Sequence, residues 1–340
     1  MNAQLEKIAS LEKIASEVIY NQDICNLLQN PNNNGLYKDL VDFQRKECEK
    51  HNSSIATEGF QIGEPWNGDI ENAPILFLSS NPAYNFYEIS PRWYWDKCSL
   101  HICVSGECLC ILNSDNGGKK ILKGKNGDPM SLENILEFIR TRIKESPAKS
   151  DKDIALRIRL KKDNAIYTPA VPYWGNVRER TEYLLPDELK ISLGNKMTPA
   201  EYARKIMEYV VCMEVIPFRS TGEAGLKKNT EKIFDYCWDR FTLKILKLSG
   251  ASIFVLVGSK VLNTFTRNLN LHQSIESNLQ VGKPFELTIG ARNRIIIYVP
   301  FNLGTIPYLP DCLPSETIRQ LRDTLARRII FDELYKFNQK

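Results

Sequence analysis

The stretch Pro74-Ile-Leu-Phe-Leu-Ser-Ser-Asn-Pro-Ala-Tyr84 decides the fold, because in it an apolar run stops abruptly at a small polar turn. Residues 75–78 are four consecutive apolar residues, which is the pattern of a short strand buried on both faces. The turn supplies two hydroxyls, the carboxamide of Asn81 and a proline that fixes the backbone. Open α/β sheets bind ligands just beyond such strand ends, so this turn is the first candidate site. An ordinary connection between a strand and a loop is the alternative.

Three more apolar runs predict three more buried strands, at residues 209–216, 252–257 and 295–299. Amphipathic helices are predicted around them, at residues 229–248, 259–268 and 315–328. Buried strands that alternate with helices indicate parallel pairing, because each crossover between parallel strands needs a connecting helix. The expected core is a three-layer α/β/α sandwich with a mainly parallel four-stranded central sheet.

The first part of the chain is predicted to be helical. Residues 5–16 repeat the hexapeptide LEKIAS, with apolar residues at near-helical spacing, and residues 36–50 form a second helical pattern after an asparagine-rich break. We therefore expect a helical N-terminal extension over residues 1–70. The α/β/α domain is expected over residues 71–330, with an irregular insertion at about 96–130 and a C-terminal tail at 331–340.

The composition is that of a globular chain with a small positive charge. The 340 residues are 43% hydrophobic and 25% charged, and 45 Lys and Arg against 41 Asp and Glu leave a net charge of +4. This balance permits a polyanionic partner without requiring one. No apolar segment approaches the roughly 20 residues of a membrane helix, and the start lacks a signal-peptide run. We therefore expect a cytoplasmic protein with no membrane partner.

Nine cysteines in a cytoplasmic chain are expected to be reduced thiols. Four of them cluster around His101, but their spacing lacks the paired two-residue gaps of common zinc modules. Buried or loop thiols are the favoured interpretation over a metal site, so no metal and no cofactor is predicted. The clustered cysteines are Cys98, Cys103, Cys108 and Cys110.

Glu214 is a candidate recognition residue because it lies inside an apolar strand pattern. A carboxylate in such a place costs several kcal/mol unless it is paired or hydrogen-bonded. A structural ion pair is one explanation. The functional explanation is a recognition carboxylate that faces the same cleft as Asn81. Carboxylates accept hydrogen bonds from the exocyclic amine of cytosine, which gives about 1–3 kcal/mol of discrimination.

Two groups of apolar side chains are candidate contacts to nucleic acid. Trp93 and Tyr94 follow the Asn81 turn and could stack on a base, although core packing explains aromatic residues equally well. Phe301 and Leu303 follow the fourth strand, where exposed apolar residues suit a wedge between base pairs; packing against the core is the alternative. The sequence shows no complete P-loop, no GxSxG elbow and no histidine metal motif.

Together these strand ends resemble the uracil-DNA glycosylase superfamily over about residues 71–328. LFLSSNPAY resembles its first motif, a strand running into Gly-x-Asn-Pro-Gly or Gly-Gln-Asp-Pro-Tyr, with Asn81 at the water-positioning residue. VVCMEVIP resembles the strand that delivers the base-reading Asn, with Glu214 in its place. VPFNLG resembles the second motif, His-Pro-Ser-Pro-Leu-Ser, with Leu303 at the wedge residue and Val299 at the histidine.

The departures from the family pattern indicate the substrate. Ala83 stands where uracil-specific members carry a Tyr that excludes substituents at the pyrimidine 5-position, so there is room for one. Glu214 favours the amine of cytosine over the carbonyl oxygen of uracil. Asn302, a backbone amide or a protonated Glu214 would take over from the histidine that is missing at Val299. Ser80, Trp93 and Tyr94 are the remaining expected base contacts.

The resemblance thus implies a monofunctional DNA glycosylase without a cofactor. It would flip a hypermodified cytosine, a base found in phage genomes, out of double-stranded DNA. Some bacterial superfamily members of this kind act in antiphage defence. The attacking water would be held by Asn81. Two alternatives remain open, namely a non-catalytic module that binds modified DNA and a nucleoside or nucleotide hydrolase.

Overall fold

The structure is a computed structural model of the whole chain. It describes residues 2–19, 21, 23–24, 27, 32–50, 66, 68–80, 103–104, 107–108, 112–114, 120–122, 158–160, 167–169, 172–195, 197, 202, 205–218, 230–301 and 306–337. The chain divides into two units. Unit 1 comprises Met1–Trp66, Ser80–Ile143 and Glu214–Ile245, and unit 2 comprises Asn67–Ser79, Lys144–Met213 and Leu246–Lys340. The division predicted at about residues 70 and 330 stays a prediction.

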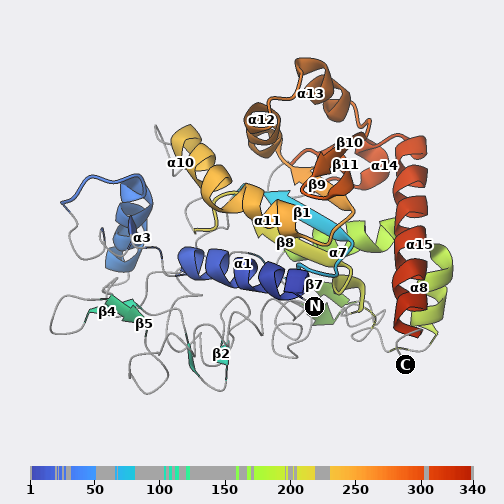
Figure 1. Cartoon of the computed structure of the whole chain (residues 1–340), viewed down its shortest axis with the longest axis horizontal. Coiled ribbons are helices and arrows are strands. Elements are labelled where there is room, and N and C mark those ends of the chain that lie inside the picture. Colours follow the sequence, from blue (N-terminus) through green and yellow to red (C-terminus); the bar gives the residue numbers. More distant parts are fainter. Residues whose placement is uncertain are drawn as a thin grey trace. The chain divides into compact units, whose positions relative to one another are not determined.

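Unit 2 is built on a mixed, mostly parallel sheet (Figure 1). Its strand order is β10-β11-β9-β1-β8, and β9 pairs in parallel with both β1 and β11. β8 also runs parallel to β1, because Ile75 N–H donates to Tyr209 O and Ile216 N–H donates to Ser80 O. The four predicted strands are confirmed as β1 (Ile75–Ser79), β8 (Val210–Glu214), β9 (Ile253–Val257) and β11 (Arg292–Val299).

The prediction of four strands was wrong, because the sheet has a fifth. β10 (Phe285–Ile289) pairs antiparallel with β11 through a two-residue turn that begins at Gly290. Gly290 has a φ of 66°, which favours glycine, and its position suits a tight hairpin. Exposed and less exposed residues alternate along β10, as in an edge strand with one face in solvent. A search for continuous apolar runs does not find such a pattern.

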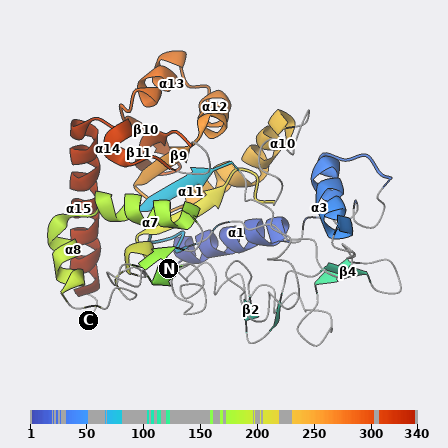
Figure 2. The ribbon, with the colours of Figure 1, turned by 180° about the vertical axis from the view of Figure 1, so that it is seen from behind.

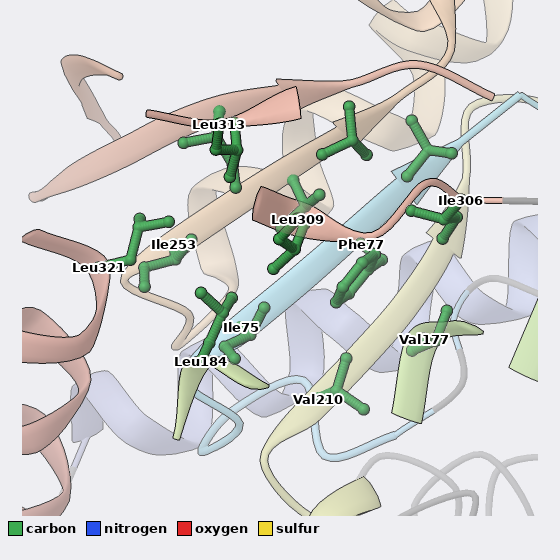
Figure 3. Close-up of a cluster of buried hydrophobic side chains, with 14 of the residues drawn as sticks. Ile75, Phe77, Val177, Leu184, Val210, Ile253, Ile306, Leu309, Leu313 and Leu321 are labelled. Atoms are coloured by element: carbon green, nitrogen blue, oxygen red, sulfur yellow. The ribbon is translucent and has the colours of Figure 1, made fainter. Parts of the chain in front are cut away.

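One face of the sheet packs against three helices of unit 2, namely α7 (Pro172–Leu184), α14 (Leu309–Cys312) and α15 (Ser315–Phe337). Figure 3 shows side chains from these segments gathered over one face of the strands, with Phe77 among Ile306 and Leu309. Alternate residues of each strand supply this cluster, as the two-residue period of a strand requires. The helix predicted to begin at Ser315 is confirmed and is longer than expected.

The opposite face of the central strands is also buried. Leu76, Phe254 and Ile296 all have no exposed surface. α12 (Ser259–Asn268) contacts β9, and α13 (Gln273–Gln280) contacts β10 and β11. Figure 2 views unit 2 from the side of α7, α15 and α8 (Asp187–Gly194). Both faces of β1 and β9 are therefore covered, as expected for parallel strands.

Unit 1 contains the predicted N-terminal helices and most of the helix predicted at residues 229–248. The first two are α1 (Asn2–Ile19) and α3 (Lys38–Lys50). The third is interrupted: α10 (Thr230–Cys237) passes through a π-helical turn, η3 (Trp238–Thr242), into α11 (Leu243–Leu248). The buried ring of Tyr37 packs edge-on against Phe218 with ring centroids 5.0 Å apart. This contact between two buried rings is part of the core of unit 1.

The region predicted to be an irregular insertion contains two short antiparallel pairs, and a third lies later in the chain. They are β2 (Cys103–Val104) with β3 (Glu107–Cys108), β4 (Leu112–Ser114) with β5 (Lys120–Leu122), and β6 (Ile158–Leu160) with β7 (Tyr167–Pro169). Among the helices that the structure describes, none combines the length and the apolar character that crossing a membrane requires.

Candidate functional site

The strand order points to the carboxyl ends of β1 and β9. The chain passes from β1 outward to β8 and then returns across β1 to β9 and on to β11. The order therefore reverses between β1 and β9, and open α/β sheets bind ligands outside the strand ends at such a reversal. Ser79 ends β1, and Gly258 follows β9 with a φ of 90°. The first candidate site of the sequence analysis thus begins at a strand end with the expected topology.

Ser80 follows β1, and Glu214 ends the neighbouring strand β8. Both residues belong to unit 1. Glu214 is the last residue of β8, and strand alternation puts it on the same face as Val210 and Cys212. Glu214 as a whole is partly exposed, whereas its Oε2 atom is buried. Ser80 is partly buried, and its carbonyl oxygen accepts a hydrogen bond of 2.9 Å from the backbone N–H of Ile216. The backbones at the ends of β1 and β8 are therefore held together.

A buried threonine holds the chain immediately after Glu214. The hydroxyl of Thr242 donates to the carbonyl oxygen of Val215 at 3.2 Å, and Thr242 is 1% exposed. Thr242 ends the π-helical turn, in which Leu243 N–H donates to Trp238 O. Such turns are rare and often occur at functional sites. The sequence analysis did not find Thr242, because neither a π-helical turn nor a contact across 27 residues has a reliable sequence signal.

The end of β11 separates two residues that the sequence analysis had placed in one motif. Val299 is fully buried in the hydrophobic cluster of unit 2, and its carbonyl oxygen accepts a hydrogen bond of 3.0 Å from Gly258 N–H. Phe301 is 44% exposed. Val299 is therefore a core residue, whereas Phe301 presents an apolar ring to solvent.

Six of the predicted site residues lie outside the described residues, so their roles stay predictions. They are Asn81, Ala83, Trp93, Tyr94, Asn302 and Leu303. The same holds for Cys98, His101 and Cys110 of the cysteine cluster, and for the side chains of Cys103 and Cys108. Of the predicted residues, the structure describes Ser80, Glu214 and Phe301, together with Val299.

The chemistry available at the described strand ends is that of hydrogen bonding. Burial raises the pKa of the Tyr298 phenol above its ordinary value. Within the described ranges there is no group of three or more His, Cys, Asp or Glu side chains that could hold a metal ion. In unit 1 the described strand ends present the carboxylate of Glu214 and the hydroxyl of Ser80, and in unit 2 Phe301 exposes an aromatic ring.

A carboxylate and a hydroxyl suit recognition of a polar ligand by hydrogen bonds, and an exposed aromatic ring suits stacking on a flat ligand. No protein-family model matches this chain, and no curated protein sequence matches it either.

Proposed function

We propose that this protein is a monofunctional DNA glycosylase that excises a 5-substituted cytosine from double-stranded DNA. The observation that supports the proposal most is the position of Glu214. Its carboxylate stands at the carboxyl end of β8 with one oxygen buried, and the backbone around it is hydrogen-bonded to the end of β1 and to Thr242. A carboxylate fixed in this way suits the reading of one edge of a base.

The charge of Glu214 determines the preferred base. An ionised carboxylate only accepts hydrogen bonds, so it pairs with the exocyclic amine of cytosine and repels the corresponding carbonyl oxygen of uracil. Such a contact discriminates by about 1–3 kcal/mol. The small side chain of Ala83 would leave space beside the 5-position, and Ser80, Trp93 and Tyr94 are the other proposed base contacts. Hypermodified cytosine in phage DNA fits these proposed contacts, and antiphage defence would be the biological role.

The proposed reaction is hydrolysis of the N-glycosidic bond. The target nucleotide leaves the duplex at a cost of a few kcal/mol, which contacts in the pocket partly offset. As the bond from C1′ to the base nitrogen breaks, the sugar becomes a cation like that of glycoside hydrolysis. Asn81 holds a water whose hydroxyl adds to C1′, and the proton it loses ends on the departing base. Asn302 stabilises the negative charge on that base, and an abasic site remains.

Phe301 and Leu303 are the proposed wedge. The exposed ring of Phe301 stands directly beyond the end of β11. An apolar side chain that enters the base stack fills the gap left by the flipped nucleotide. No metal and no cofactor takes part in the proposed reaction.

We also infer that the sheet is the middle layer of a three-layer α/β/α sandwich in a cytoplasmic protein. Burial of both faces of β1 and β9 supports this inference, as does the cover that α7, α14 and α15 give to one face. In such a fold the crossover helices lie on both sides of the parallel strands.

The deciding assay uses duplex oligonucleotides that contain one uracil, cytosine, 5-hydroxymethylcytosine or glucosylated 5-hydroxymethylcytosine. We expect alkali-labile abasic sites at a modified cytosine and little release of uracil. Asn81→Ala should abolish release, whereas Asn278→Ala on the exposed surface of α13 should not. No release of any modified cytosine, or equal release by Asn81→Ala, would contradict the proposal.

A second candidate function is a non-catalytic module that binds modified DNA. The burial of Val299 favours it, because a hydrocarbon side chain in the core cannot stabilise charge on a departing base. This candidate predicts binding that depends on the modification and weakens with salt, without base release. The same oligonucleotides distinguish the two functions when binding and release are measured together.

A further inference from the structure

The two residues after Glu214 are both buried and both hydrogen-bonded through the backbone. The carbonyl oxygen of Val215 accepts from the hydroxyl of Thr242 at 3.2 Å, and Ile216 N–H donates to Ser80 O at 2.9 Å. Val215 and Ile216 have no exposed surface, and Thr242 is 1% exposed. The only side chain among these hydrogen-bonding groups is that of Thr242, so it can be altered without changing the backbone.

Thr242 belongs to the π-helical turn η3, and a second residue of this turn contacts the same segment. The buried ring of Phe241 packs edge-on against the buried ring of Phe218, with ring centroids 6.4 Å apart. The turn is closed by the hydrogen bond from Leu243 N–H to Trp238 O, so it holds one residue more than an α-helical turn. Turns of this kind frequently occur at functional sites. Here the turn contacts the chain after Glu214 through both a hydroxyl and a ring.

We propose that Thr242 is a positioning residue for the carboxylate of Glu214 and thereby helps to determine which base is accepted. This inference rests on the proposed function, in which Glu214 accepts a hydrogen bond from the amine of cytosine. Such a bond weakens steeply when its distance or angle changes, so selectivity depends on where the backbone holds the carboxylate. Valine has nearly the shape of threonine but cannot donate, so Thr242→Val removes the hydrogen bond to Val215 O with little change in volume.

The alternative is that Thr242 only stabilises the fold, and Thr317 offers a matched comparison. Thr317 of α15 is 3% exposed, and its hydroxyl donates to the carbonyl oxygen of Gly282 at 3.0 Å. Gly282 is 35 residues away in the chain, so this contact also joins two distant segments. Both threonines are therefore buried helical residues that hold a distant backbone carbonyl. Only Thr242 holds the chain next to Glu214, so only its loss should change base selectivity.

The experiment measures kcat/KM for base release from two duplexes, one with glucosylated 5-hydroxymethylcytosine and one with uracil, and compares their ratio between variants. We expect Thr242→Val to lower this ratio by about 2-fold to 10-fold, the range for loss of one hydrogen bond. Thr242→Ser keeps the hydroxyl and should recover most of the ratio, whereas Thr317→Val should leave it unchanged. In a Glu214→Gln background, Thr242→Val should change the ratio no further, because its effect passes through the carboxylate.

Each outcome has a separate meaning. An unchanged ratio in Thr242→Val, an equal fall in Thr317→Val, or the same fall with and without Glu214 would overturn the role of Thr242 and leave the proposed function standing. An unaltered protein that releases no base from either duplex would overturn the proposed function, and the role of Thr242 with it. If urea unfolding shows that Thr242→Val does not fold, Thr242→Ala takes its place. An unchanged ratio in that variant would then reject the inference.

Discussion

The backbone N–H of Ile216 donates to the carbonyl oxygen of Ser80 at 2.9 Å, so the ends of β1 and β8 stay joined beyond Glu214. Immediately after Glu214, the carbonyl oxygen of Val215 accepts a hydrogen bond from the Thr242 hydroxyl. The backbone that carries Glu214 is thus held before any ligand arrives. A carboxylate on such a backbone loses little conformational freedom on binding, which favours specific recognition.

Replacing Glu214 by Gln should reduce the selectivity for modified cytosine over uracil. A carboxamide can turn either its oxygen or its nitrogen toward the base, so it tolerates the uracil carbonyl. We expect the ratio of kcat/KM for the two bases to fall by about 5-fold to 150-fold, equivalent to the loss of 1–3 kcal/mol. Glu208→Gln is the control. Glu208 lies just before β8 and forms a salt bridge with Lys205 at 2.7 Å. An unchanged ratio in Glu214→Gln would show that this carboxylate does not read the base.

Gly250→Ala should strongly destabilise unit 2. A Cβ on Gly250 would lie 1.7 Å from the carbonyl oxygen of Glu71, which is backbone and cannot rotate away. We expect the free energy of unfolding, measured in urea, to fall by about 3 kcal/mol or more. Gly194→Ala in α8 is the control, since nothing lies within 4 Å of its added Cβ. A loss as small as that of the control would disprove the close approach at Gly250.

Arg294→Met should also destabilise unit 2, through a different cause. The Arg294 side chain is buried and donates hydrogen bonds to the carbonyl oxygens of Ser249 and Ala251, just after α11. Burial lowers the pKa of Arg294 to about 10, so part of the lost hydrogen bonding is offset when the charge is removed. We expect a net loss of about 1–3 kcal/mol in urea unfolding. Arg292→Met, at an exposed position with one hydrogen bond to Gly250 O, should cost less. Equal effects would contradict this account.

The stability of unit 1 should fall in alkaline solution. Burial raises the pKa of the Cys237 thiol from 9.0 to about 12, and burial raises that of Tyr37, whose hydroxyl lies 3.6 Å from the thiol sulfur. Between pH 9.0 and about 12 the unfolded chain loses the Cys237 proton while the native chain keeps it. The free energy of unfolding then falls as pH rises, by about 1.4 kcal/mol per pH unit for each such group. This stabilisation is complete below pH 9.0.

Cys237→Ala tests the assignment, because it should flatten the alkaline dependence by removing one of these protons. Urea unfolding across this pH window measures the slope for the variant and the unaltered protein. The variant is also expected to lose some stability at neutral pH, since it removes the contact with Tyr37. A slope that does not change would mean that Cys237 does not titrate in this window.

The sequence predicts the elements whose burial is uniform and misses those whose burial alternates or is slight. The four buried strands appear as continuous apolar runs, and α12 begins and ends where its pattern predicts. β10 was missed because its residues alternate in exposure. α13 was missed because it is short and mostly polar, and it begins at a His272 side chain that accepts from Ser274 N–H. Nothing in the sequence marks the π-helical turn at Trp238–Thr242.

The residues of the candidate site likewise differ in whether the sequence predicts them. Glu214 could be placed at a strand end, because an acid in an apolar run is visible in the sequence. Val299 was aligned with a catalytic position by motif order alone, and only the structure shows that it packs in the core. Thr242 donates to a backbone oxygen that is 27 residues away in the chain. Contacts of that kind depend on tertiary packing, which residue patterns do not encode locally.

The hairpin of β10 and β11 has a consequence for how the protein behaves at high concentration. Without β10, the apolar segment Ile295-Ile-Ile-Tyr-Val299 would form the border of the sheet and offer unpaired amide groups to another molecule. β10 pairs with β11 from Arg292 to Ile296, so it covers the first two residues of this run, and it presents the exposed residues Glu286 and Thr288 at the border instead. The hairpin therefore hinders pairing of another molecule with the first part of this apolar strand.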